Sequence, residues 1–185
     1  MTKVFIGGSR RISRLDADVK RRIDRIIEKR LQVLVGDANG ADKAVQEYLR
    51  SKGYDLVEVF CSGDACRNNQ GGWATRTIPV PNNGKRKDFS FYATKDRAMA
   101  DEATVGLMLW DGESVGTVMN VLRLIRNRKM AVVYVAPDHE LVDVKTESDW
   151  EQFLSRCPDG LRERVAKESL VEQGDERGVV QASFL

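Results

Sequence analysis

The sequence predicts an α/β fold: a doubly wound, mainly parallel sheet of about five strands, followed by a small C-terminal helical appendix. Short apolar runs alternate along the chain with segments whose apolar residues recur at helical spacing, which is typical of βαβ units. In addition, glycine-bearing turns directly follow three of the apolar runs, as loops do at the carboxyl ends of parallel strands. These turns cover residues 7–10, 36–42 and 111–117.

The first half of the chain contains three predicted strands, separated by two amphipathic helices. The first helix is expected to start at Ser13, because Asp16 stands three residues later as in a capping box, and its apolar stripe runs from Leu15 to Leu31. The second helix begins near Ala41 and is expected to stop at Gly53. The strands around these helices are predicted at 3–6, 32–35 and 56–60.

The second half predicts two further strands, at 105–110 and 131–135, with a helix from about 117 to 127 between them. Before them lies a long segment, 61–88, rich in Gly, Asn, Pro, Lys and Arg. Segments of this length are usually functional or mobile, so it is expected to be either a flap over the site or a disordered surface loop. After residue 137 the pattern changes to two short helices and a polar tail. In a doubly wound sheet the first strand is central, and the cleft lies between the first and fourth strands.

Composition narrows the classes of function. The chain of 185 residues suits one domain and carries 30 basic against 28 acidic residues, a net charge of +2. This near-neutral net charge argues against nucleic acid as a partner, and any basic patch that bound it would have to be local. The three cysteines predict reduced thiols in a cytoplasmic protein. The apolar stretch at the N-terminus is too short for a signal peptide or a membrane span, so no membrane partner is expected.

A metal site is not predicted. Cys61 and Cys66 could be joined by Cys157 or His139, but their spacing fits no common structural zinc site. No cofactor is expected either.

Four short motifs follow one another along the chain in an order that is also found in a known protein family. Gly8-Ser9-Arg10 and Gly40-Ala41-Asp42 follow the first two strands, 92–99 is a basic helix ending in Met, and 111–117 has a Gly-x-x-x-Gly-Thr ending. Over residues 1 to about 136 they resemble the SLOG superfamily, the Rossmann-like group that holds the DNA-processing protein A family and the Lonely guy phosphoribohydrolases. The order is also similar to the branch related to YpsA and the molybdenum-cofactor-carrier proteins.

The resemblance implies a Rossmann-like nucleotide-binding domain at 1–136 and a helical appendix and tail at 137–185. It also implies a homodimer, because relatives often pair. Two departures matter for chemistry. Asn120 stands where the phosphoribohydrolases have a glutamate, and an amide cannot act as general base. Lys95 stands where they have an arginine, so the charge is kept but bidentate phosphate geometry is lost.

Phosphate is expected on backbone N–H groups of the first and third turns, with Arg10 and Lys95 neutralising its charge. Each turn could instead serve only the path of the backbone. Asp96 or Asp111 could take over the catalytic role vacated at Asn120, and these two are the candidate catalytic residues. The candidate ligand-binding residues are Gly7, Gly8, Ser9, Arg10, Gly36, Asp37, Asn39, Gly40, Asp42, Lys95, Arg97, Gly112, Ser114, Gly116, Thr117 and Asn120.

The function predicted from these residues is binding of a nucleotide or nucleotide-derived, phosphate-bearing small molecule. One alternative is an N-glycosidic hydrolase or transferase acting on a nucleoside monophosphate or an NAD-like substrate. A second is single-stranded DNA binding along the basic first helix, although that face could also be a solvated one paired with its acidic neighbours. A ligand sensor that contacts a partner protein is a third. The basic residues concerned are Arg10, Arg11, Arg14, Lys20, Arg21, Arg22 and Arg25.

Overall fold

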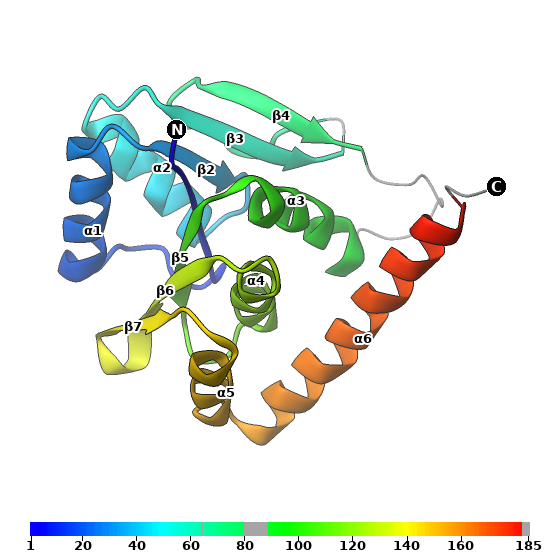
Figure 1. Ribbon diagram of the computed structural model, residues 1–185. Helices are drawn as coiled ribbons and strands as arrows, with labels where there is room; N and C mark the ends of the chain where they lie inside the picture. The colour runs from blue at the N-terminus through cyan, green and yellow to red at the C-terminus, as the bar shows by residue number, and fades with distance from the viewer. Residues whose placement is uncertain (64, 80–88, 183–185) are drawn as a thin grey trace.

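A computed structural model describes residues 1–63, 65–79 and 89–182. Its centre is one sheet with strand order β4-β3-β2-β1-β5-β6-β7 (Figure 1). All neighbouring strands are parallel except β6 and β7, which pair antiparallel. The strands are β1 Lys3–Gly8, β2 Gln32–Gly36, β3 Val57–Ser62, β4 Ala74–Ile78, β5 Val105–Trp110, β6 Met130–Val135 and β7 Glu140–Val144.

Helices cover both faces of this sheet (Figure 1). The helices α1 and α2 lie on one face and α3 and α4 on the other, while α5 and the long α6 extend the second layer. The helices are α1 Ala17–Glu28, α2 Ala41–Ser51, α3 Phe89–Glu102, α4 Val115–Arg126, α5 Glu147–Ser155 and α6 Asp159–Ala182, with a 3-10 turn at Ala136–Asp138. The predicted α/β fold class is therefore confirmed.

Strand β1 shows how its sequence forms a central strand. Val4 and Ile6 are buried in the core beneath α1 and α2, whereas Phe5 between them is buried in the core beneath α3 and α4. Because successive side chains of a strand point to opposite faces, a strand covered on both faces needs a continuous apolar run. β1 pairs with β2 on one side and β5 on the other. This arrangement confirms the predicted central strand and the switch point beside it.

The C-terminal helices share the core of the sheet. Phe153 of α5 and Leu161 and Val165 of α6 are buried in the same apolar cluster as Trp110 at the end of β5. The rings of Trp110 and Phe153 meet edge to face, with centroids 5.3 Å apart. This packing holds the start of α6 beside the carboxyl end of β5.

Two strands lie where none was predicted, so the sheet has seven described strands rather than about five. β4 falls inside the segment 61–88, for which a flap or a loop was expected, and residues 80–88 of that segment lie outside the described residues. β4 is an edge strand whose side chains are largely exposed, so it has no apolar run. Helix α1 also differs at its start, since Asp16 is its N-cap and accepts from the Asp18 N–H at 2.9 Å.

The cysteines differ from expectation as well. Cys61 and Cys66 form a disulfide, with Cα atoms 5.1 Å apart, whereas reduced thiols were predicted for all three cysteines. Cys157 is a free, buried cysteine, and burial raises the pKa of its thiol to about 11. Among the described residues, no helix is both long and apolar enough to cross a membrane.

Candidate functional site

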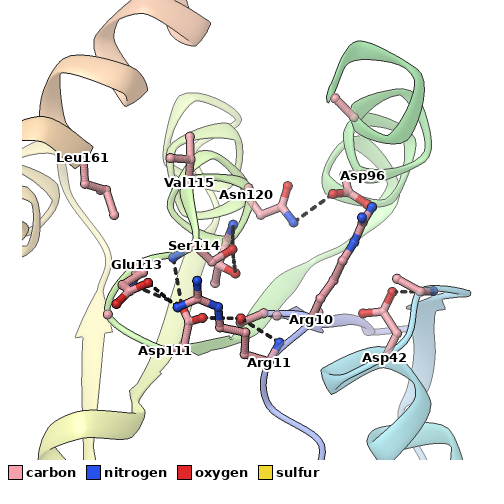
Figure 2. A pocket seen from close by; sticks show the side chains of 18 of the residues that line it. Arg10, Arg11, Asp42, Asp96, Asp111, Glu113, Ser114, Val115, Asn120 and Leu161 are labelled. Carbon is pink, nitrogen blue, oxygen red and sulfur yellow. Dashed lines mark hydrogen bonds and ion pairs between the residues drawn. The ribbon is translucent and has the colours of Figure 1, made fainter. Parts of the chain in front are cut away.

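A pocket of about 720 Å³ opens at the carboxyl ends of β1 and β5 (Figure 2). Each of the three glycine-bearing turns contributes to its lining, together with α3, α4 and the start of α6. The loops that leave neighbouring strands at a switch point form such a site in doubly wound sheets. The volume falls within the range typical of small-molecule sites.

Ser9 joins the three turns. Its backbone N–H donates to the Leu109 carbonyl at 2.9 Å, and its own carbonyl accepts from the Ala41 N–H at 3.0 Å. Its buried hydroxyl donates to Asp111. Gly8 precedes it without a side chain, and a Cβ there would press on the carbonyl and Cβ of Leu109. The close approach of β1 and β5 therefore requires glycine at this position.

The third turn is built around the carboxylate of Asp111. One oxygen accepts from Ser9, and the other accepts from the backbone N–H groups of Glu113 and Ser114 at 3.1 and 2.8 Å. Burial alone would raise the pKa of Asp111, but these hydrogen bonds lower it by more than burial raises it, so the net shift is downward. Gly112 has φ +87°, a left-handed conformation that favours glycine. Asp111 is thus an ionised residue that holds the turn.

Helix α4 begins in the pocket directly after this turn. Ser114 is its N-cap, accepting from the Thr117 N–H at 3.3 Å and from the Thr117 hydroxyl at 3.0 Å. The N–H groups of Val115 and Gly116 belong to the first turn of the helix, where no helix carbonyl is available to accept them. Both residues line the pocket. The start of α4 therefore offers backbone donors and the positive end of a helix dipole to a ligand.

A buried ionic cluster forms the side of the pocket near α3. Lys95 Nζ lies 2.7 Å from Asp96 Oδ1 and 3.7 Å from Asp42 Oδ2, and the Lys95 side chain is only 5% exposed. Gly36 leaves the space that this cluster fills, because a Cβ there would collide with Asp42 and Lys95. Asp42 also accepts from the Ala38 N–H at 3.1 Å. The Lys95 ammonium is thus shared by two carboxylates.

Burial and the neighbouring charges act in opposite directions on the pKa values of Asp42 and Lys95. Desolvation raises the pKa of Asp42 to about 6, although the Lys95 charge lowers it. Burial would lower the pKa of Lys95, but the carboxylates of Asp96 and Asp42 outweigh it and the net shift is upward. Lys95 therefore stays protonated, and Asp42 changes its charge near pH 6.

Asn120 connects this cluster to the C-terminal helix. Its Nδ2 donates to Asp96 Oδ2 at 3.3 Å, and its Oδ1 accepts from Arg123 Nη1. The guanidinium of Arg123 is buried and also donates through Nε to Glu172 Oε2 of α6 at 3.2 Å, and through Nη2 to the other carboxylate oxygen. A continuous polar path thus runs from the pocket wall to α6.

Most of the sequence-predicted site residues line this pocket. They are Gly7, Gly8, Ser9, Arg10, Asp42, Lys95, Asp96, Asp111, Gly112, Ser114, Gly116, Thr117 and Asn120. Figure 2 shows Arg10 extending across the pocket from the loop after β1 toward Asp96 on α3. Of the two predicted catalytic carboxylates, Asp111 is engaged by its own turn. Asp96 is oriented by Lys95 and Asn120 at the pocket wall.

The other predicted residues lie outside the lining. They are Gly36, Asp37, Asn39, Gly40 and Arg97. Arg67 contacts the buried carboxylate of Asp37 through its backbone N–H at 3.1 Å and through its guanidinium at 2.6 and 3.0 Å. Burial would raise the pKa of Asp37, but the bonds from Arg67 lower it overall. Asn39 accepts from Asn68 at 3.0 Å. These contacts attach the segment 65–73 to the second turn.

Sequence reasoning missed one wall of the pocket. Pro158, Gly160, Leu161 and Arg164 line it from the start of α6, and Arg11 and Glu113 form an ion pair at its mouth. The C-terminal residues carry no motif, since their place depends on how α6 packs against α4. Among the described residues, no group of three or more His, Cys, Asp or Glu side chains is placed to hold a metal ion.

The sheet order and the switch-point pocket define a Rossmann-like, doubly wound α/β fold. It is similar to the solved structure of DNA processing protein A from Helicobacter pylori, with a TM-score of 0.56, 12% sequence identity, and coverage of 93% of this chain and 81% of that chain. No family model and no curated protein matches the sequence. At this identity the likeness shows the fold, and the resemblance to the SLOG superfamily and its branches stays a prediction.

One expectation about partners is corrected by this comparison. The solved structure was described for a single-stranded DNA binding mode, so a protein of this fold binds nucleic acid. The argument against nucleic acid from a net charge of +2 is therefore wrong. Binding depends on the local field rather than on the net charge of the whole chain, and Arg10, Arg11 and Arg164 all lie at one pocket.

Proposed function

We propose that the pocket binds the phosphate-bearing part of a free nucleotide. The observation that carries this proposal is the start of α4, whose first-turn residues Val115 and Gly116 line the same pocket as the Arg10 side chain. An anion at a helix N-terminus is stabilised by backbone donors and by the helix dipole, and an arginine adds a charge-assisted hydrogen bond.

The remaining lining suits the sugar and the base. Asn120 and Asp96 lie further along the pocket wall from Ser114 (Figure 2), and their amide and carboxylate groups can hold ribose hydroxyls. Asn120 is six residues after Ser114, roughly 9 Å along the helix axis at 1.5 Å per residue. Leu161 and Val115 offer apolar surface. Phosphate, sugar and base can therefore each meet a chemically suitable part of one cavity.

Single-stranded DNA is the second candidate, and the comparison with DNA processing protein A favours it. The residues that would extend a DNA path beyond the pocket are basic side chains on α1 and its approach. Arg14, Arg21 and Arg25 are exposed there. A DNA path would follow the backbone over several nucleotides, whereas the pocket alone accommodates one.

Calorimetric titration of the parent and two variants separates the candidates. Arg10→Ala removes a cation of the pocket, and Arg25→Ala is the matched control because Arg25 lies on α1 outside the lining. A charge-assisted hydrogen bond contributes about 1.5–3 kcal/mol, so Arg10→Ala should weaken AMP binding at least about tenfold. Arg25→Ala should leave AMP binding unchanged.

The same variants are titrated with a twenty-nucleotide oligothymidylate. If DNA follows α1, Arg25→Ala weakens oligonucleotide binding and lowers its salt dependence. Equal AMP affinity in the parent and in Arg10→Ala would exclude the proposed phosphate site. Oligonucleotide binding by a parent protein that binds no mononucleotide would replace the first candidate with the second.

A further inference from the structure

We infer that Glu172 of α6 is a positioning residue for the pocket, acting through Arg123 on the Asn120 amide. The inference rests on the proposed function, because a nucleotide is the ligand whose affinity it concerns. Glu172 lies 52 residues after Asn120 in the sequence and does not line the pocket itself. Its effect must therefore be transmitted by the side chains between them.

The orientation of Asn120 is set from both ends of its amide. Oδ1 accepts from the Arg123 guanidinium, and Nδ2 donates to Asp96. An amide whose oxygen faces a cation and whose nitrogen faces a carboxylate is held in one of its two flip states, because a flip would oppose donor to donor and acceptor to acceptor. Arg123 thus determines which polar group Asn120 and Asp96 present to the pocket.

Arg123 in turn depends on Glu172. Its side chain is 6% exposed and that of Glu172 is 7% exposed, so the pair is removed from water. Glu172 accepts through both carboxylate oxygens, from Nε at 3.2 Å and from Nη2. A buried guanidinium that loses its carboxylate must find another partner or move toward water. Asn120 Oδ1 is the group that Arg123 already contacts, so its position changes with that of Arg123.

Helix α6 is therefore attached to the pocket at two places. Its start at Gly160, Leu161 and Arg164 lines the cavity, and Glu172 reaches the wall through the buried path. Figure 1 shows α6 running along the outside of the helical layer, away from the sheet. By linkage, if docking of α6 supports ligand binding, bound ligand must equally stabilise α6 against local opening.

Ser169 provides a matched control on the same helix. Its hydroxyl accepts from Arg126 of α4, so Ser169→Ala also removes a contact between α6 and α4. Arg126 lies outside the pocket lining. A general loosening of α6 would affect both variants, whereas transmission through Asn120 affects only Glu172→Gln.

A double-mutant cycle on AMP affinity tests the path. Glu172→Gln should weaken AMP binding at least fivefold, and Ser169→Ala should change it by less than twofold. In an Asn120→Ala background the effect of Glu172→Gln should disappear, because the transmitting amide is absent. An undiminished effect in that background, or equal affinity of Glu172→Gln and the parent, would overturn the inference while leaving the proposed function standing.

Hydrogen exchange on the parent chain supplies a readout that needs no variant, in case Glu172→Gln fails to fold. Saturating AMP should slow amide exchange in residues 161–174 at least threefold relative to α1, which is remote from the path. Unchanged exchange in 161–174 with AMP bound would overturn the inference. Failure of the parent to bind AMP at all would instead refute the proposed function.

Discussion

The Asp42→Asn variant should gain stability relative to the parent chain as the pH rises from acid to neutral. Asp42 is buried, and its pKa is raised from 3.8 to about 6 although Lys95 lies 3.7 Å away. The stability contributed by a carboxyl with a raised pKa is complete below its unfolded pKa and is lost as the pH rises through its folded pKa. The amide of Asn can still accept from the Ala38 N–H, but it has no charge to bury.

The magnitude follows from the shift. Each pKa unit corresponds to about 1.36 kcal/mol, so the rise from 3.8 to about 6 costs the folded parent about 3 kcal/mol, most of it between pH 4 and pH 7. Asp37 has a lowered pKa, so its contribution to the stability of the folded chain increases as the pH rises through the acid range. This contribution is present in both chains and cancels in the difference. The free energy of unfolding of Asp42→Asn minus that of the parent should therefore rise by about 3 kcal/mol over this range.

Urea unfolding followed by circular dichroism at pH 4, 5, 6 and 7 measures this difference. Extrapolated free energies carry an error of about 10–15%, so a rise of this size is resolved. Parallel pH profiles for the two chains would mean that Asp42 titrates alike in the folded and unfolded states. That result would refute the description of Asp42 as a buried carboxylate whose lysine partner, Lys95, is shared with Asp96.

Three further substitutions test how the turns are held. Gly8→Ala adds a Cβ against the Leu109 carbonyl and should cost about 1–3 kcal/mol of unfolding free energy in urea; an unchanged midpoint would show that β1 and β5 have room to spare. Asp37→Ala removes the buried partner of Arg67 and should speed amide exchange in residues 65–73 without affecting α4; equal exchange would show that Arg67 does not attach that segment. Ser114→Ala removes the N-cap of α4 and should cost about 1 kcal/mol, a loss that a differential urea measurement would detect or exclude.

The sequence allowed most of the sheet to be predicted because the inner parallel strands are buried on both faces. The strand expected at 105–110 coincides with β5, whose residues after Val105 are all buried. β4 had no such signal. Its Arg76 pairs with Glu58 and Glu102, and a strand with exposed and charged side chains resembles a loop in sequence. An edge strand needs only its backbone to pair, and backbone pairing leaves no pattern of residue types.

The candidate site was predictable to the extent that it consists of backbone turns. Glycines after Ile6 and Trp110 mark where a parallel strand ends, and both loops line the pocket. Side-chain roles were less accessible. Asp37 follows a strand as a ribose ligand would, yet it is engaged by Arg67 from a segment thirty residues away. Such long-range pairing depends on tertiary packing, and no pattern in the sequence links Asp37 to Arg67.

The most direct test of the central claim is a crystal structure of the chain with bound AMP. The account places the phosphate at the start of α4, within hydrogen-bonding distance of the Gly116 N–H and of the Arg10 guanidinium, with the ribose toward Asn120 and Asp96. A phosphate bound elsewhere, with the start of α4 occupied by neither phosphate nor sugar, would contradict it.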